Sequence, residues 1–187
     1  GLTPPNRKKG SVDRLTAEEV DQLLEATYEE MGATKGLMVR TLLETATRVS
    51  TFCQLQARHI SFREREIEVI GKGDKRRAVP IRQALASELR QHLDGRESGY
   101  LFPSPRGGHY SERRVQQIVK EAAEEAGLTK RVYPHLLRHT MAQRLADRGM
   151  PENLLQRFLG HDHPATTQVY YEPSRSQVKE AFREATD

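Results

Sequence analysis

The chain has 187 residues, of which 36% are hydrophobic and 30% are charged, and its net charge at pH 7 is +4. This length allows one domain with a sizeable core, and the recurring leucines and valines exclude a disordered chain. A single cysteine, Cys53, excludes an internal disulfide, and no apolar run reaches the roughly 18 residues of a membrane-spanning helix. We expect a soluble intracellular protein whose basic excess is compatible with a polyanionic partner.

The pattern of residues 1–81 predicts an arm, two helices and a sheet. Residues 1–13 are rich in proline, glycine and basic side chains, which is typical of a flexible linker or arm. Thr16 to Glu19 form a capping box before an apolar-periodic run, and a second helix is expected over about 34–47. Three short β-rich runs then predict a small antiparallel sheet, at 59–62, 66–70 and 77–81.

The rest of the chain reads as helical. Gly149 and Gly160 each follow an expected helix, in the position where glycine commonly closes one. The expected helices lie at about 82–93, 111–126, 135–148, 151–159 and 166–171, with a last one from about 175 to 186. The predicted fold class is therefore mainly α with a small three-stranded antiparallel β-sheet (α+β).

The six residues PHLLRH, at 134–139, suggest two kinds of site. His135 and His139 lie four apart and would share a helix face, which is a spacing found in metal sites. A zinc helix of the type HExxH carries a glutamate as general base, however, and Leu136 stands at that position. In the second interpretation, His135 and Arg138 lie beside the free N–H groups of a helix N-terminus, which favour an anion such as phosphate. We therefore expect no metal.

Several motifs in order support the phosphate interpretation. HLLRHTMAQRLADRG, LLQRFLGH and ATTQVYY follow one another near the C-terminus, and the tyrosine lies nine residues after the histidine of LGH. This pattern resembles the C-terminal signature of tyrosine recombinases, the phage-integrase and Xer family. TRVS at 47–50 lies where that family carries its first arginine, and IGKGDK at 70–75 looks like its β-hairpin lysine segment. The resemblance covers about residues 14–175 and implies the catalytic-domain fold of the family.

The resemblance implies cleavage and rejoining of DNA strands at a phosphate. Arg48 and Arg138 would grip the non-bridging oxygens, which suits the planar and permanently charged guanidinium group. Tyr170 would attack the phosphorus and form a 3′-phosphotyrosyl bond. A free tyrosine has a pKa of about 10, so it must be activated in place.

Three further residues take roles by the same resemblance. His135 would accept a proton, His161 would donate a hydrogen bond to a phosphate oxygen, and Lys72 would protonate the departing 5′-oxygen. The covalent bond stores the phosphodiester energy, so neither ATP nor a cofactor nor a metal is implied. Lys75 is an alternative to Lys72, and Tyr171 is a rival nucleophile. His139 is expected to be structural.

The chain departs from the family pattern at three places. Thr47 stands where the family usually has a glycine before its first arginine, and Thr51 stands where a glutamate is common. Tyr171-Glu172 replaces a common Thr-His pair. Because a carboxylate at position 51 would orient Arg48, its absence leaves open a DNA-binding module with weakened catalysis. A type IB topoisomerase-like nicking-closing enzyme is a second alternative, and a metal hydrolase is the third.

The resemblance also implies partners and a location. Double-stranded DNA is the expected partner, with a homo-tetramer on DNA for the full-length protein, a monomer for this chain alone and no membrane association. Residues 14–187 are expected to form the catalytic domain, and the family's N-terminal core-DNA-binding domain is expected to be absent from this chain. The expected location is the cytoplasm, in association with the nucleoid.

The last expected helix carries an apolar stripe on one face. Val178, Ala181, Phe182 and Ala185 recur at helical spacing. One interpretation is that this face packs on its own domain. The other, implied by the resemblance, is that it docks on a neighbouring protomer. The sequence does not decide between them.

Overall fold

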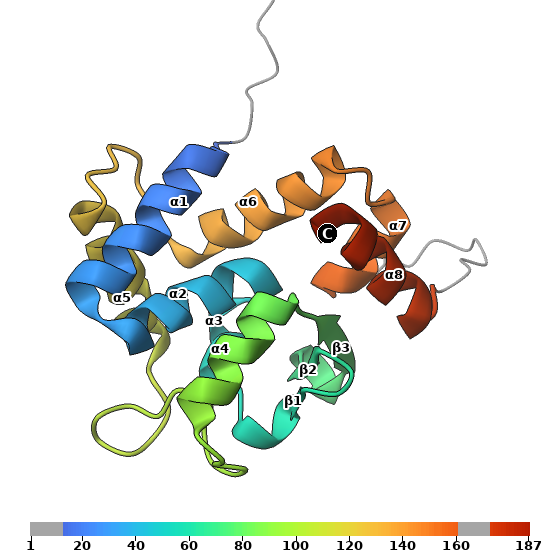
Figure 1. Ribbon diagram of the computed structural model, residues 1–187, viewed down its shortest axis with the longest axis horizontal. Coiled ribbons are helices and arrows are strands. Elements are labelled where there is room, and N and C mark those ends of the chain that lie inside the picture. Colours follow the sequence, from blue (N-terminus) through green and yellow to red (C-terminus); the bar gives the residue numbers. More distant parts are fainter. Residues whose placement is uncertain (1–12, 161–172) are drawn as a thin grey trace, which may run out of the picture.

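The computed structural model describes residues 13–160 and 173–187, and Figure 1 shows how their helices surround a small sheet. The described chain has the predicted class, mainly helical with one three-stranded antiparallel sheet. α1 (Ala17–Ala26) begins at the predicted capping box. The Glu19 N–H donates to the Thr16 hydroxyl at 3.1 Å, and the Thr16 N–H donates to the Glu19 carboxylate at 3.2 Å.

The remaining elements match most of the predicted ranges. Four short helical pieces were not predicted: the π-helical turn at Thr27–Met31, the helix at Val49–Cys53 and the 3₁₀ turns at Ala57–His59 and Lys72–Asp74. The expected helix at 166–171 lies outside the described residues. In chain order the elements after α1 are η1 (Thr27–Met31), α2 (Ala33–Thr45), α3 (Val49–Cys53), η2 (Ala57–His59), β1 (Ile60–Ser61), β2 (Glu66–Ile70), η3 (Lys72–Asp74), β3 (Arg76–Pro80), α4 (Gln83–Leu93), α5 (Glu112–Glu125), α6 (Pro134–Asp147), α7 (Glu152–Leu159) and α8 (Arg175–Thr186).

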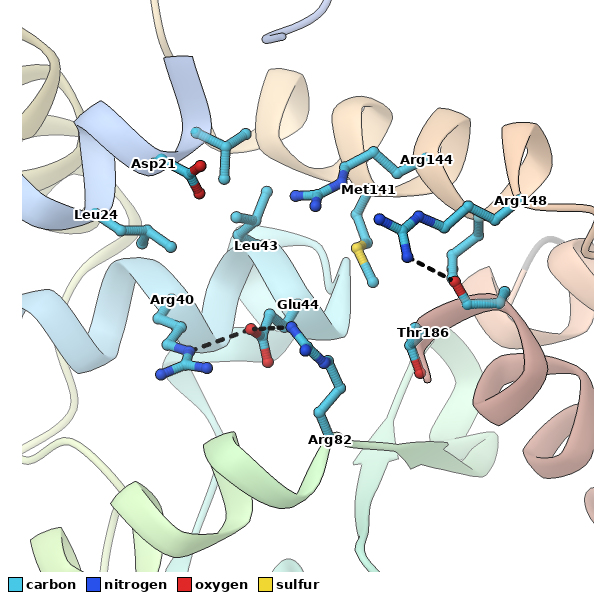
Figure 2. Close-up of a pocket in the computed structure, with 13 residues that line it drawn as sticks. Asp21, Leu24, Arg40, Leu43, Glu44, Arg82, Met141, Arg144, Arg148 and Thr186 are labelled. Atoms are coloured by element: carbon cyan, nitrogen blue, oxygen red, sulfur yellow. Dashed lines mark hydrogen bonds and ion pairs between the residues drawn. The ribbon is translucent and has the colours of Figure 1, made fainter. Parts of the chain in front are cut away.

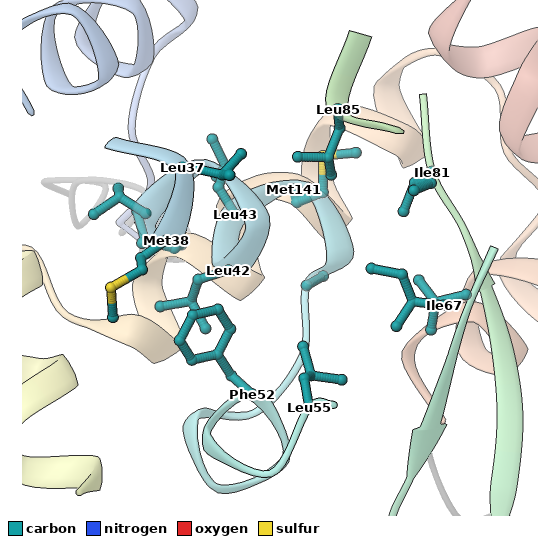
Figure 3. Close-up of a cluster of buried hydrophobic side chains, with 14 of the residues drawn as sticks. Leu37, Met38, Leu42, Leu43, Phe52, Leu55, Ile67, Ile81, Leu85 and Met141 are labelled. Atoms are coloured by element: carbon teal, nitrogen blue, oxygen red, sulfur yellow. The ribbon is translucent and has the colours of Figure 1, made fainter. Parts of the chain in front are cut away.

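The helix α2 forms the centre of the fold. It contacts α1, α4, α5 and α6, and nearly all of its second half is buried. Figure 3 shows Leu42 and Leu43 of α2 among apolar side chains that reach from Phe52 to Ile67 of the sheet and Met141 of α6. Apolar burial of this kind is the main stabilising contribution to a domain core. Because the core fixes the end of α2, it also fixes the chain that follows.

The sheet has the strand order β1-β2-β3, and both pairings are antiparallel. In the β2–β3 register, Ile67 pairs with Val79 and Val69 pairs with Arg77. Successive side chains of a strand point to opposite faces, so Arg77 lies on the same face as Val79. That face carries fully buried side chains, and an arginine there is unusual.

The helix α8 packs on its own chain. Val178, Ala181, Phe182 and Ala185 are all buried, and α8 contacts α6, α7 and β3. The ring of Phe182 stacks on Phe158 of α7, with centroids 5.4 Å apart. Of the two interpretations of the apolar stripe, the structure shows the intramolecular one.

Candidate functional site

The helix α6 presents the PHLLRH segment as the phosphate interpretation predicts. Pro134 occupies its first turn, where a missing N–H costs nothing, and Tyr133 precedes it in extended conformation. His135 is exposed at this end of the helix, whereas Arg138, one turn later, is only 4% exposed. The segment therefore combines an accessible imidazole, a buried guanidinium group and a helix N-terminus.

Main-chain carbonyls hold Arg138 in place. Its guanidinium donates to the Ala46 carbonyl, just after α2, and to the Leu159 carbonyl at the end of α7, the latter at 2.9 Å. The C-terminal carbonyls of a helix carry partial negative charge, which favours a cation beside them. Arg138 thus ties the ends of two helices together and keeps further N–H donors for a ligand.

Arg48 lies next to Arg138 in space although it is far from it in sequence. It follows the end of α2, is the N-cap residue of α3 and has an exposed side chain. The pKa of Arg138 is lowered to about 10, first by burial and then by the positive charges of Arg48 and Arg77. The two arginines implied by the family resemblance are therefore brought together.

The backbone before Arg48 explains one departure from the family pattern. Ala46 has φ 50°, in the left-handed region that favours glycine, whereas Thr47 is buried and its hydroxyl lies 3.1 Å from that of Thr45. The position that calls for glycine in this fold is thus Ala46 rather than Thr47. Thr51, in α3, is half-buried, and Arg48 has no carboxylate partner among the described residues.

Sequence reasoning missed Arg77, which lies near Arg48 and Arg138. Its Nε donates to the Phe158 carbonyl at 3.3 Å, in the last turn of α7. Burial lowers the pKa of Arg77 to about 10, and the charges of Arg48 and Arg157 add to that effect. The available signal was the strand period, since Arg77 falls in phase with the apolar Val79. We call Arg48, Arg77, Arg138 and Arg157 the arginine cluster.

Lys72 lies in the hairpin between β2 and β3. Its side chain is exposed, and Gly73 beside it has φ 71°, a left-handed conformation that glycine adopts without strain. The Lys72 side chain makes no hydrogen bond or ion pair with another described residue. Lys75 lies on the same hairpin, where its carbonyl accepts from the Gly71 N–H at 2.8 Å. The choice between the two lysines stays a prediction.

The remaining predicted residues lie outside the described part of the chain. These are His161, Tyr170 and its rival Tyr171. The described chain reaches Gly160, the left-handed residue that ends α7 and directly precedes His161 in sequence. The roles of these three side chains therefore stay predictions.

His139 lines a cavity of about 290 Å³ together with His135, Arg138 and Leu159. It is half-buried, and its pKa is lowered by burial and, to a lesser extent, by His135 and Arg14. Among residues 13–160 and 173–187, no group of three or more histidine, cysteine, aspartate and glutamate side chains could hold a metal ion. The spacing of His135 and His139 thus has no third protein ligand within that part of the chain.

A larger groove opens beside His135. It has a volume of about 850 Å³, runs along α5 and the segment before α6, and contains the basic residues Arg113, Lys120, Lys130 and Arg131. Basic side chains along a groove raise the local concentration of anions. Glu124 also lines the groove and Lys130 pairs with Glu19 at 2.8 Å, so Arg113, Lys120 and Arg131 supply most of its positive charge.

Figure 2 shows another pocket, which contains none of the predicted site residues. It has a volume of about 270 Å³ and lies between α1, α2, α6 and the end of α8. The buried Glu44 carboxylate accepts from Arg40 at 3.1 Å, and Arg82 approaches the same oxygen at 3.8 Å.

Within the described residues, no helix is long and apolar enough to cross a membrane.

Comparison with known proteins places the chain in a family. Residues 13–177 match the phage integrase family. The tyrosine recombinase XerC of Corynebacterium efficiens is 37% identical over 79% of this chain and 49% of its own length. The tyrosine recombinase XerA of Pyrococcus furiosus is 35% identical over 98% of this chain and 65% of its own length. The chain thus spans about half to two thirds of these relatives.

Solved structures agree on the fold. The crystal structure of XerA recombinase superposes with a TM-score of 0.76 and 29% identity, over 99% of this chain and 67% of that one. The integrase from mycobacterium phage Brujita superposes with a TM-score of 0.77 and 22% identity, over 98% and 61% of the two chains. The chain belongs to the phage integrase family and is a relative of the Xer tyrosine recombinases.

Proposed function

We propose that this chain is the catalytic domain of a site-specific DNA recombinase, formed by residues 14–187. The observation that carries the proposal is the convergence of Arg48, Arg77 and Arg138 without a described carboxylate partner. Three neighbouring guanidinium groups attract anionic oxygens, and a DNA phosphodiester supplies two non-bridging oxygens that share one negative charge. The basic groove beside His135 would hold the flanking DNA.

The proposed reaction follows from this arrangement. Arg48 and Arg138 hold the non-bridging oxygens, and His161 donates a further hydrogen bond. Tyr170 attacks the phosphorus, its proton passes to His135, and Lys72 protonates the 5′-oxygen that leaves. A 5′-hydroxyl from another strand reverses these steps, so the reaction needs neither ATP nor a metal. Positioning and charge neutralisation supply most of the catalysis in such phosphoryl transfers.

A second candidate function rests on position 51. Thr51 supplies no carboxylate to orient Arg48, and this favours a DNA-binding module with weakened catalysis. A nicking-closing enzyme would use the same chemistry.

We propose a homo-tetramer on DNA and a monomer without it. The intramolecular burial of the α8 stripe supports the monomer.

The experiment that tests the proposal traps the covalent bond. A pool of nicked duplexes with randomised sequence is incubated with the protein in EDTA, and DNA–protein adducts that survive denaturation are isolated and sequenced. We expect adducts from the unaltered chain and from Tyr171→Phe, but none from Tyr170→Phe. Adducts that persist in Tyr170→Phe would reject that nucleophile. Binding of the pool without any adduct would favour the binding module.

A further inference from the structure

Arg77 lies against the proposed phosphate site without a role in the steps above. Its strand position turns it toward the core face of the sheet, on the side of Val79, rather than toward solvent. A half-buried arginine needs hydrogen-bond partners, and the Phe158 carbonyl supplies one at 3.3 Å. Arg77 and Arg138 therefore approach consecutive carbonyls, those of Phe158 and Leu159, at the end of α7.

The contact between Arg77 and Gly160 is unusually close. A Cβ atom added at Gly160 would come within 2.5 Å of the guanidinium carbon of Arg77. Gly160 also has φ 71°, a backbone conformation that favours glycine, and a Cβ atom there would have to displace the Arg77 guanidinium. The guanidinium thus lies against Gly160, which directly precedes His161 in the sequence.

The charge of Arg77 is not neutralised within the described residues. It forms no ion pair there, and its described electrostatic neighbours are Arg48, Arg138 and Arg157. Burying a cation beside like charges is unfavourable in the free protein. An anion bound between Arg77 and Arg138 would offset that cost, so the cluster is arranged for a ligand rather than for stability.

We propose that Arg77 is a third arginine of the phosphate site and a positioning residue for the end of α7 at Gly160. This inference rests on the proposed function for its link to strand cleavage. The planar guanidinium serves both purposes, because one edge reaches the Phe158 carbonyl while the other donors remain for a phosphate oxygen. Lysine retains the charge but cannot make both sets of contacts at once.

The test compares Arg77→Met and Arg77→Lys with Arg76→Met. Arg76 is the neighbouring strand residue on the opposite face, where it is exposed and pairs with Glu68 at 3.2 Å. Melting temperature is measured without DNA, and single-turnover cleavage is measured over a range of DNA concentrations. We expect Arg77→Met to melt no lower than Arg76→Met and to cleave on the order of 10²-fold more slowly at saturating DNA. Arg77→Lys should recover part of that rate.

Two results would overturn the proposal. One is wild-type cleavage by a folded Arg77→Met or Arg77→Lys protein. The other is a fall in melting temperature without a fall in the cleavage rate of the folded protein, which would make Arg77 merely structural. If Arg77→Met does not fold, Arg77→Lys decides by the same criterion, since full cleavage by that variant rejects the need for a guanidinium.

A second measurement separates this inference from the proposed function. Chloride is replaced by sulfate at equal ionic strength, and the rise in melting temperature is compared between variants. A bound anion stabilises the folded state in proportion to its affinity. We expect a smaller rise for Arg77→Met than for the unaltered chain and Arg76→Met. Equal rises in all three would reject Arg77 as an anion ligand, whether or not the unaltered chain forms a DNA adduct.

Discussion

At the scale of single residues, Arg138 shows how a buried charge is held ready for a ligand. Its two carbonyl partners, at Ala46 and Leu159, come from segments that meet only in the folded chain. Its pKa of about 10 leaves it charged at neutral pH, although burial and two neighbouring arginines disfavour the charge. Removing a comparable preorganised donor typically slows a reaction on the order of 10²–10³-fold.

His139 gives a prediction for the pH dependence of stability. Its folded-state pKa lies below the usual value of about 6.5, first because of burial, so below pH 6.5 the unfolded chain binds the proton more readily. This contribution to stability is complete above pH 6.5 and is lost as the pH falls toward the folded-state pKa. We expect His139→Gln to lose less unfolding free energy than the unaltered chain between pH 7 and 5, as measured by urea denaturation. Equal losses would contradict the prediction.

At the scale of elements, the end of α7 gives a prediction about glycine. Gly160 and Gly149 both have positive φ, but a Cβ at Gly149 would meet nothing within 4 Å. Gly149→Ala should therefore cost only the backbone strain, about 1–2 kcal/mol. Gly160→Ala should cost more, because its methyl group also collides with the Arg77 guanidinium. Thermal and urea unfolding measure both costs.

A double variant isolates the contact with Arg77. In an Arg77→Ala background the collision at Gly160 is removed, so Gly160→Ala should cost about as much as Gly149→Ala. The two substitutions would then show a clear interaction free energy. If the unfolding free-energy costs of the two substitutions simply add, Arg77 does not restrict the residue at position 160.

The attachment of α8 gives a further prediction. Glu66 of β2 is 3% exposed, accepts from Arg175 Nε at 2.6 Å and lies 3.3 Å from the Lys179 ammonium. Glu66→Gln leaves these cations without their buried counter-charge and should lower the unfolding free energy by about 1–3 kcal/mol. Glu64→Gln is the control, since Glu64 is exposed and pairs only with Lys179 among the described residues. Limited proteolysis of α8 is the measurement. Faster cleavage in Glu64→Gln than in Glu66→Gln would contradict the claim that Glu66 holds α8 in place.

Much of this element structure was predictable from local pattern. The capping residue Thr16, the alternating run at 66–70 and the glycines after α6 and α7 each specify a boundary within a few residues. The π-helical turn at Thr27–Met31 was not predictable, because packing rather than propensity selects it. The strand period could have placed Arg77 on the face of Val79, but its hydrogen bond to the Phe158 carbonyl at the distant end of α7 is in no local pattern.

At the scale of the whole molecule, the fold brings together residues from four separate segments. Arg48 follows α2, Arg77 lies on β3, and Arg138 lies on α6, while the end of α7 supplies the carbonyls that hold the last two. The family motifs indicated Arg48 and Arg138, but only the tertiary structure shows that a third arginine, the half-buried Arg77, lies near them and that none of the three has an ion-pair partner among the described residues. Figure 1 shows the two helices α6 and α7 meeting beside α8, which covers the outer side of this junction.

The central claim is that this junction presents a DNA phosphate to Tyr170. The most direct measurement determines both ends of the covalent bond. Trapped adducts are digested with protease and nuclease, the modified peptide is identified by mass spectrometry, and the released DNA end is tested for phosphorylation by a 5′-kinase. We predict a nucleotide joined through its 3′-phosphate to Tyr170 and a released strand with a free 5′-hydroxyl. A 5′-phosphate linkage with a released 3′-hydroxyl, or attachment to any residue other than Tyr170, would contradict the account.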